Sequence, residues 1–205
     1  MSNQSRSIGS IVPEATALKA LSHPLRLRLL GLLRVEGPAT ASGLAARLGL
    51  NSGATSYHLR QLALHGFIEE EVDRGSRRDR WWRACHEMTR SLTADVAGDA
   101  LDAGLAFQQA ALQWQMQQMQ GALTAYVGLP QDWRAASTAS DYTIALSAEA
   151  ARALVKKLEA VLAEAMAAAP PLGTPLPQGM RPFSIIVNAA PRATETVGPA
   201  GQDGA

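Results

Sequence analysis

Cysteine and histidine are scarce in this sequence, which has one cysteine, Cys85, and four histidines among 205 residues. A single cysteine excludes an internal disulfide framework, the usual support of small exported domains. Residues 1–14 also lack the apolar core and the small-residue cleavage site of a secretory signal. We therefore expect a cytoplasmic protein.

Long hydrophobic runs are also missing. Although 47% of the residues are hydrophobic and 18% are charged, no apolar run approaches the roughly 20 residues that span a bilayer. This composition is typical of a soluble globular protein with no membrane segment. A chain of 205 residues is long enough for one sizeable core or two small ones, and we favour two units.

The residue patterns of catalytic and metal sites are absent too. The sequence has no Gly-rich phosphate loop, no nucleophile elbow and no paired carboxylates in a recognisable frame, so we do not expect an enzyme. Metal sites need clustered thiolates, imidazoles or carboxylates. This chain offers only the adjacent Cys85 and His86 and the isolated His23, His58 and His65. We expect no metal and no other cofactor, and we interpret Cys85 as a small buried hydrophobe rather than a redox sensor.

Positive charge is concentrated in one half of the chain. Residues 1–90 hold 13 Lys and Arg against 8 Asp and Glu, giving +5, whereas residues 91–205 hold 6 against 10, giving −4. Long-range attraction to a polyanion would therefore come from the N-terminal half only.

The most informative stretch is residues 51–65, with the sequence NSGATSYHLRQLALH. It begins with two good N-cap residues, is followed by Gly66, and carries His58, Leu59 and Leu62 on one face, which predicts a short amphipathic helix. The other face has hydroxyls, an amide and a guanidinium but no acid, which suits a polyanion: Ser52, Ser56, Tyr57, Arg60 and Gln61. A second short helix is predicted at residues 41–48, and the tight segment 49–51 joins the two as a helix-turn-helix.

A two-stranded hairpin, or wing, is predicted after this pair, from residues 67–72 and 81–85 around a turn at 73–76. Its tip is rich in arginine: Arg74, Arg77, Arg78 and Arg80. Arg77 and Arg78 are the better candidates for the minor groove or flanking phosphates. For Arg80 and Arg83, a cross-strand charge ladder with residues 69–71 and a contact to DNA both remain open.

The runs ALSHPLRLRLLGLL, GLAARLGLNSGATSYHLRQLALHGFIEEE and WWRA, with an Arg-rich turn before the last, resemble the winged helix-turn-helix domain of the ArsR-like bacterial transcription regulators. The resemblance covers about residues 14–88. It implies a homodimer that reads an inverted repeat in double-stranded DNA, more often as a repressor. The implied DNA-binding residues are Asn51, Ser52, Thr55, Ser56, Tyr57, His58, Arg60, Gln61, Arg74, Arg77 and Arg78. The family's thiol-rich metal signature is absent, and so is a His/Asp pair on the helix after the wing, so metal sensing is not implied.

The DNA-binding domain is predicted to span residues 14–90, after a disordered tail at 1–13. Its first helix should cover 14–21. A second helix at 25–35, N-capped by Ser22, should form the buried centre with its three arginines pointing outward or snorkelling.

Residues 91–129 are predicted to be helical, with Gly98 and Gly104 suggesting two helices or a kink. An apolar stripe at heptad-like spacing runs along this segment: Leu112, Met116, Met119, Leu123 and Tyr126. The stripe either folds back on residues 25–35 or forms a dimer interface. Regulators of this resemblance dimerise through a helix after the wing, which favours the dimer.

Residues 130–189 are predicted to form a small α/β appendage, before a disordered tail at 190–205. It would consist of a connector at 130–140, a strand at 141–146, a helix at 148–168 capped by Ser147, a Pro/Gly-rich loop at 170–182 and a strand at 181–188. The helix would turn inward its residues Leu154, Leu158, Val161, Leu162 and Ala165. The strands would pair with each other or across a dimer. The expected fold class is therefore mainly α with small β: a winged helix-turn-helix domain, a long helical dimerisation segment and a strand-helix-strand appendage.

Two alternative functions stay open. The winged helix would in one case be a protein-interaction module with no DNA role. In the other, the appendage would sense a small apolar effector in a pocket against the long helix, lined by Phe107, Trp114, Met116, Met119, Tyr126, Trp133 and Met166. Such side chains are more often part of a core or a dimer interface.

Overall fold

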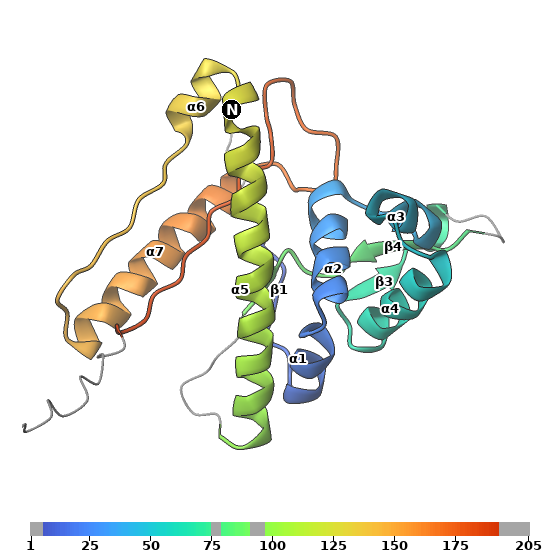
Figure 1. Cartoon of the computed structure of the whole chain (residues 1–205), viewed down its shortest axis with the longest axis horizontal. Helices are drawn as coiled ribbons and strands as arrows, with labels where there is room; N and C mark the ends of the chain where they lie inside the picture. The colour runs from blue at the N-terminus through green and yellow to red at the C-terminus, as the bar shows by residue number, and fades with distance from the viewer. Residues whose placement is uncertain (1–5, 75–78, 91–96, 193–205) are drawn as a thin grey trace, which may run out of the picture.

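The structure is a computed structural model that describes residues 6–74, 79–90 and 97–192 of the chain. Its longest helix, α5 (Asp99–Ala125), stands between two parts of the molecule. Helices α1–α4 and the strands lie on one side, and the C-terminal helices α6 and α7 lie on the other (Figure 1). The expected class, mainly helical with small sheets and a helix-turn-helix domain at the N-terminal end, is confirmed.

Helices α1 (Ala15–Leu21) and α2 (Pro24–Glu36) form where the sequence predicts them. The cap of α2 is not Ser22, as predicted, but His23, whose Nδ1 accepts the N–H of Leu25 at 3.1 Å. Pro24 occupies the first helical turn, which moves the cap to the residue directly before it. The Ser22 hydroxyl instead donates to the carbonyl of Lys19 at 2.8 Å, at the end of α1.

The prediction that all three arginines of α2 point outward or snorkel is wrong for Arg34. Its guanidinium donates to the carbonyl of His86 at 2.8 Å and to Oγ1 of Thr89 at 2.9 Å. Burial lowers the pKa of Arg34 to about 10. Arg28 is exposed, as predicted, and Arg26 donates through Nε to the carbonyl of Ala20.

The wing is confirmed, with one strand more than predicted. Strands β3 (Ile68–Glu70) and β4 (Trp81–Ala84) pair antiparallel, and β2 (Ala39–Thr40) adds to the other edge of β4. Residues Val72–Arg74 form a short 3-10 turn after β3. Helices α3 (Ala41–Leu48) and α4 (Ser52–Leu64) follow β2, so the helix-turn-helix and the wing share one framework.

A second small sheet contradicts the expected disorder for part of residues 6–13, the described portion of the predicted tail. Strand β1 (Ser10–Ile11) pairs in parallel with β5 (Met88–Thr89). Arg6 forms a bidentate ion pair with Glu87, in which its two terminal nitrogens donate to the two carboxylate oxygens at 2.6 and 2.7 Å. This long-range pairing could not be seen locally, because neither strand is longer than two residues.

Helix α5 begins after Gly98, which has a φ of +57°. The kink predicted at Gly104 is wrong, since Gly104 is buried inside an unbroken helix. The first half of α5 packs against α1 and α2 through Ala103, Phe107 and Ala110, and the Trp114 ring covers Gly31 of α2. Of the two alternatives for this segment, packing against α2 therefore applies only to the first half of α5.

The C-terminal unit, residues 130–189, differs most from expectation. Helix α7 (Ala148–Ala168) is confirmed with Ser147 as its cap, but α6 (Gln131–Ala136) occupies the predicted connector after a 3-10 turn at Tyr126–Gly128. Within the chain, segments 141–146 and 181–188 form no strand. No residue of α7 is buried, because no layer of this chain covers its apolar face. Across the described ranges, none of the helices combines the length and apolarity that crossing a bilayer would take.

We predict that Arg34→Met lowers the free energy of unfolding by about 2 to 3 kcal/mol, since it removes charge-assisted hydrogen bonds to two partly buried acceptors. Urea denaturation followed by circular dichroism measures the loss. Arg28→Met, an exposed change on the same helix, is the control and should alter stability by less than about 0.5 kcal/mol. Equal losses in both variants would contradict a role for the Arg34 contacts.

Candidate nucleic-acid interface

Two caps and one left-handed glycine set the angle between α3 and α4. Oγ1 of Thr40 accepts the N–H of Gly43 at 3.1 Å at the start of α3, and Oδ1 of Asn51 accepts the N–H of Gly53 at 2.7 Å at the start of α4. Gly49, between them, has a φ of +64°, a conformation that L side chains rarely adopt. Beneath the turn, Leu44 of α3 and Leu59 of α4 belong to the buried core. The predicted helix-turn-helix geometry is present.

The outer face of α4 carries most of the predicted DNA-binding side chains. Ser52, Tyr57 and Arg60 are exposed, and Ser56 and Gln61 are half-buried. Arg60 has no ion-pair partner among residues 6–74, 79–90 and 97–192. Asn51 is exposed, although its side-chain oxygen is engaged in the cap. The helix therefore presents hydroxyls and a free guanidinium, and its sequence has no acid to repel a phosphate.

Thr55 does not belong to this face, contrary to prediction. It is 0% exposed, and its Oγ1 donates to the carbonyl of Asn51 at 3.0 Å. Helical periodicity places it one turn before Leu59, on the buried side. Its role is to support the helix, not to contact DNA.

His58 is half-buried rather than presented to solvent. Its ring lies 4.5 Å from that of His23 and 5.3 Å from that of Tyr57, between centroids. Its Nδ1 is buried and has no hydrogen-bond partner among the described atoms. Burial, followed by the positive charge of His23 and Arg26, lowers the pKa of His58. Burial and Arg26 lower the pKa of His23 in the same way. The pair joins α4 to the start of α2.

The cross-strand charge ladder of the wing is confirmed. Arg83 pairs with Glu69 at 2.6 Å, and Arg80 pairs with Glu70 at 3.0 Å. The guanidinium of Arg74 lies 5.6 Å from the centroid of the Trp81 ring. The positive charges of Arg80 and Arg83 are partly compensated by these ion pairs, which reduces the contribution of both residues to the attraction for DNA. Arg77 and Arg78 lie outside the described residues.

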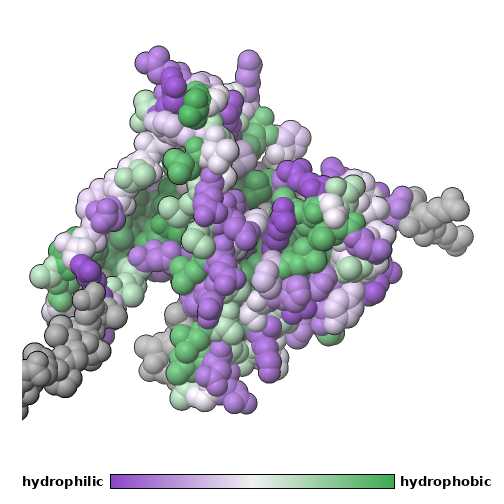
Figure 2. Space-filling view, in the orientation of Figure 1, coloured by the Kyte–Doolittle hydropathy of each residue, from purple (hydrophilic) through white to green (hydrophobic). Residues whose placement is uncertain are grey.

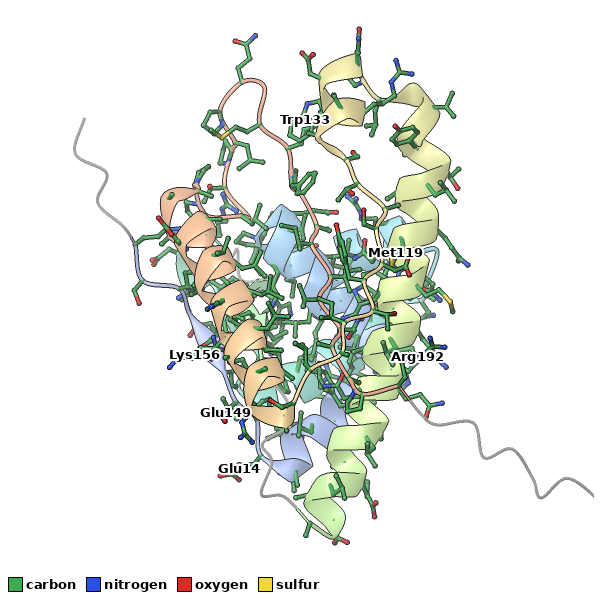
Figure 3. All side chains as sticks on the ribbon, turned by 90° about the vertical axis from the view of Figure 1, so that its left-hand side faces the viewer. Glu14, Met119, Trp133, Glu149, Lys156 and Arg192 are labelled. Atoms are coloured by element: carbon green, nitrogen blue, oxygen red, sulfur yellow. The ribbon has the colours of Figure 1, made fainter. Side chains whose placement is uncertain are left out.

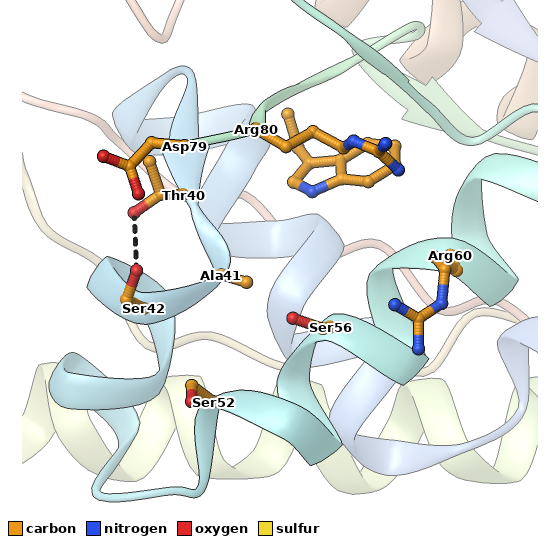
Figure 4. Close-up of a pocket in the computed structure, with 9 residues that line it drawn as sticks. Thr40, Ala41, Ser42, Ser52, Ser56, Arg60, Asp79 and Arg80 are labelled. Carbon is orange, nitrogen blue, oxygen red and sulfur yellow. Dashed lines mark hydrogen bonds between the residues drawn. The ribbon is translucent and has the colours of Figure 1, made fainter. Parts of the chain in front are cut away.

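A shallow hollow of about 400 Å³ lies between the helix-turn-helix and the wing. Figure 4 shows hydroxyls of α4 and of the start of α3 on one side and the Arg80 chain on the other. The hollow is lined by Thr40, Ala41, Ser42, Ser52, Ser56, Arg60, Asp79, Arg80 and Trp82. Sequence reasoning missed Thr40, Ser42 and Asp79, because it did not show that β2 joins the wing. Hydroxyls and guanidinium groups of this kind bind phosphate oxygens.

The structure does not gather the residues predicted to line an effector pocket. Phe107 is in the core and Trp114 covers Gly31. The Trp133 ring instead lies 6.4 Å from that of Phe183, and Met119 is exposed on α5 (Figure 3). Met116 and Tyr126 are also exposed.

The sites considered for metal and redox chemistry are equally dispersed. Within the part of the chain that the structure describes, no three His, Cys, Asp or Glu side chains are close enough to share a metal ion. Cys85 is half-buried, and burial together with the charge of Glu69 raises the pKa of its thiol. A protonated thiol is a poor nucleophile.

Comparison with known proteins assigns the class of this domain. Residues 21–71 match the family model of a helix-turn-helix domain, in agreement with the geometry of α2, α3, α4 and β3. The N-terminal part of the chain is a helix-turn-helix domain.

One relative is itself a named regulator. Over 60 residues, 29% of this chain, the sequence is 42% identical to the HTH-type transcriptional regulator YgaV of Escherichia coli (strain K12). The aligned segment covers 60% of that protein. The similarity therefore concerns less than a third of this chain and about three fifths of that regulator.

We predict that Thr55→Val lowers the free energy of unfolding by about 1 kcal/mol, because it removes a hydrogen bond inside the helix. The affinity of the folded protein for DNA should not change. Ser56→Ala, at the adjacent position on the hollow, should show the opposite pattern. Chemical denaturation and DNA titration of both variants measure the two effects, and a specific loss of DNA affinity in Thr55→Val would contradict the assignment.

Stability should also fall in mild acid. The pKa values of His23 and His58 in the folded protein are lowered below the unfolded value, about 6.5, so protonation favours unfolding. Their stabilising contribution is complete above about pH 6.5 and is lost as the pH falls through the folded-state values. His58→Phe should reduce the drop in the urea midpoint between about pH 7.5 and pH 5.5. An unchanged drop in this variant would exclude His58 as a source.

Proposed function

We propose that this protein is a transcription regulator that binds double-stranded DNA in a sequence-specific manner. It would act as a homodimer and as a repressor. The observation that carries the proposal is the exposed face of α4, which has no acid, next to a hollow whose polar lining is mostly hydroxyls and guanidinium groups, with one carboxylate, that of Asp79. The helix-turn-helix match and the regulator related to this domain support it. Such a protein would act in the bacterial cytoplasm, on the chromosome.

The geometry suits a helix placed in the major groove. Tyr57 and Arg60 on α4 would reach base edges or phosphates, and the hollow would receive a phosphate beside Ser52 and Ser56. The wing would contact the flanking backbone through Arg74, with Arg77 and Arg78 as further candidates from the sequence. The charge of +5 on residues 1–90 would attract DNA to this end of the molecule.

A second copy would give the symmetry that an inverted-repeat operator needs. The second half of α5 leaves an apolar stripe uncovered, and its five side chains are 42–76% exposed: Leu112, Met116, Met119, Leu123 and Tyr126. Pairing of two such stripes would place two α4 helices on half-sites about one helical turn apart. We refer to this set as the α5 stripe.

Fluorescence anisotropy on DNA from upstream of the protein's own gene, against scrambled DNA and across a salt series, tests the proposal. Arg60→Ala should weaken binding by about 1 to 3 kcal/mol, which is about fivefold to 150-fold. If Arg60 contacts a phosphate, the slope of log affinity against log salt should also decrease by about one. Arg192→Ala removes an equal, exposed charge that lies outside the helix-turn-helix, the wing and residues 130–189, and it should have no such effect.

The outcome against the proposal is equally specific. If the protein shows no preference for upstream DNA, and a genome-wide selection of fragments also recovers no site, the DNA-binding function fails. The winged helix would then be better explained as a protein-interaction module.

A further inference from the structure

The C-terminal unit has an apolar face that no element in the described ranges covers. Tyr142, Ile144 and Leu146 alternate along one extended segment, and Phe183, Ile185 and Val187 alternate along another. All six side chains are 46–84% exposed. Alternation of this kind is typical of strands with one buried face, yet neither segment has a strand partner within the chain. Figures 1 and 3 show both segments running beside α7.

This face continues into the α5 stripe. Figure 2 shows hydrophobic side chains gathered in the hollow between α7 and α5. On α7, Leu158 and Val161 are exposed, and on α5 so are Met116 and Met119. A monomer rarely leaves a connected apolar surface of this extent open to water, and such a surface marks an interaction site.

The accessible surface of the chain is far too large for a monomer of its mass. It is 15269 Å², whereas a folded monomer of 21.7 kDa should expose about 9,200 Å². Counting every residue outside the described ranges as fully exposed, at about 150 Å² each, accounts for at most roughly 4,000 Å² of the excess, because part of that area is already in the expected value. At least about 2,000 Å² per chain is left, which is within the range that one partner buries in an obligate homodimer.

We propose that a second copy of this chain covers the C-terminal unit, so that this unit and the α5 stripe together form one continuous dimer interface. The inference rests on the proposed function, which includes a homodimer formed through the α5 stripe. It gives this homodimer a second contact surface. Segments 141–146 and 183–187 would acquire backbone hydrogen-bond partners only when the second copy is bound.

Charge favours an identical partner over a charged one. The polar side chains of α7 include three acids and three bases: Glu149, Glu159, Glu164, Arg152, Lys156 and Lys157. A balanced surface can meet its own copy without net repulsion, whereas nucleic acid or an acidic protein would be matched by an excess of bases. The two-fold symmetry of an isologous interface also suits a face that lies next to the α5 stripe.

The test is the absolute mass of the full chain in solution, measured by light scattering after gel filtration, for wild type and for Ile144→Asp/Ile185→Asp. Wild type should have twice the mass of one chain, and the variant should have the mass of one chain. Both positions are exposed in the single chain, so the helix-turn-helix domain should remain folded. Val72→Asp, at a position of the wing that is 77% exposed and lies on the other side of α5 from the C-terminal unit, is the matched control and should remain a dimer.

Hydrogen exchange gives a second measurement. Amides in 141–146 and 183–187 should be protected in the wild-type dimer and exchange at least tenfold faster in the monomeric variant. Protection that persists in a monomer would mean that the segments pair within one chain, and it would overturn the proposal. A wild-type monomer, or a variant that remains a dimer, would also overturn it.

These outcomes are independent of the DNA-binding function. A monomeric variant that still binds a single half-site would support both proposals. A variant that loses its dimer in a protein that never binds DNA would support the interface and reject the regulator. A variant that binds the full operator as a dimer would reject the interface and leave the regulator intact.

Discussion

The burial of α2 is the constraint on which the rest of the structure depends. Leu29 and Leu30 of this helix are almost completely buried, and α2 contacts α1, α4, β4 and α5. One helix therefore supports the DNA-facing helix on one side and the start of the long helix on another. Because interiors are close-packed, a change in the orientation of α2 would move both. The angle between the α4 face and the α5 stripe is set by this shared packing.

The electrostatic character of the candidate interface depends on which charges remain uncompensated. Arg80 and Arg83 are paired with glutamates on β3, and such exposed pairs contribute little to stability. They stiffen the wing while reducing its net charge. Arg60, with no ion-pair partner in the described ranges, and the hydroxyls around the hollow are free to bind a phosphate. Selectivity would therefore depend more on α4 than on the described part of the wing.

Local sequence signals predicted the elements of the N-terminal domain well. Helices α2, α3 and α4, and α7 in the C-terminal unit, form within one or two residues of the expected positions, because caps and helical periodicity are local properties. The prediction of a kink at Gly104 was wrong because a glycine inside a helix can allow close packing instead of ending the helix. Gly104 is buried in the half of α5 that packs on α1 and α2.

Contacts between distant segments were beyond local reasoning. The pairing of β1 with β5 joins residues almost eighty positions apart, and β2 enters the wing from before α3. The buried position of Thr55 follows from helical phase, but hydroxyl residues on a DNA-facing helix were all assigned to its surface. In the C-terminal unit the opposite error arose. The alternation at 141–146 and 181–188 correctly shows an apolar face, but a single chain does not supply the layer that would cover it.

The contacts that attach the C-terminal unit to the rest of the chain show how binding of a second copy to this unit would affect the DNA-binding domain. The N–H of Gly173 donates to the carbonyl of Val35 at the end of α2, and a Cβ added at Gly37 would overlap the backbone of Gly173. Arg6, besides pairing with Glu87, donates to the carbonyl of Ala169 at the end of α7. The Gly173 contacts hold one end of the unit against α2 through backbone groups, which leave little room for adjustment, and the Arg6 contact holds the end of α7 against the N-terminal segment. A second copy that orders the unit would therefore act on α2 directly, in addition to its action through α5. Since α2 also supports α4, dimer formation and the placement of the DNA-facing helix would be coupled through the same helix.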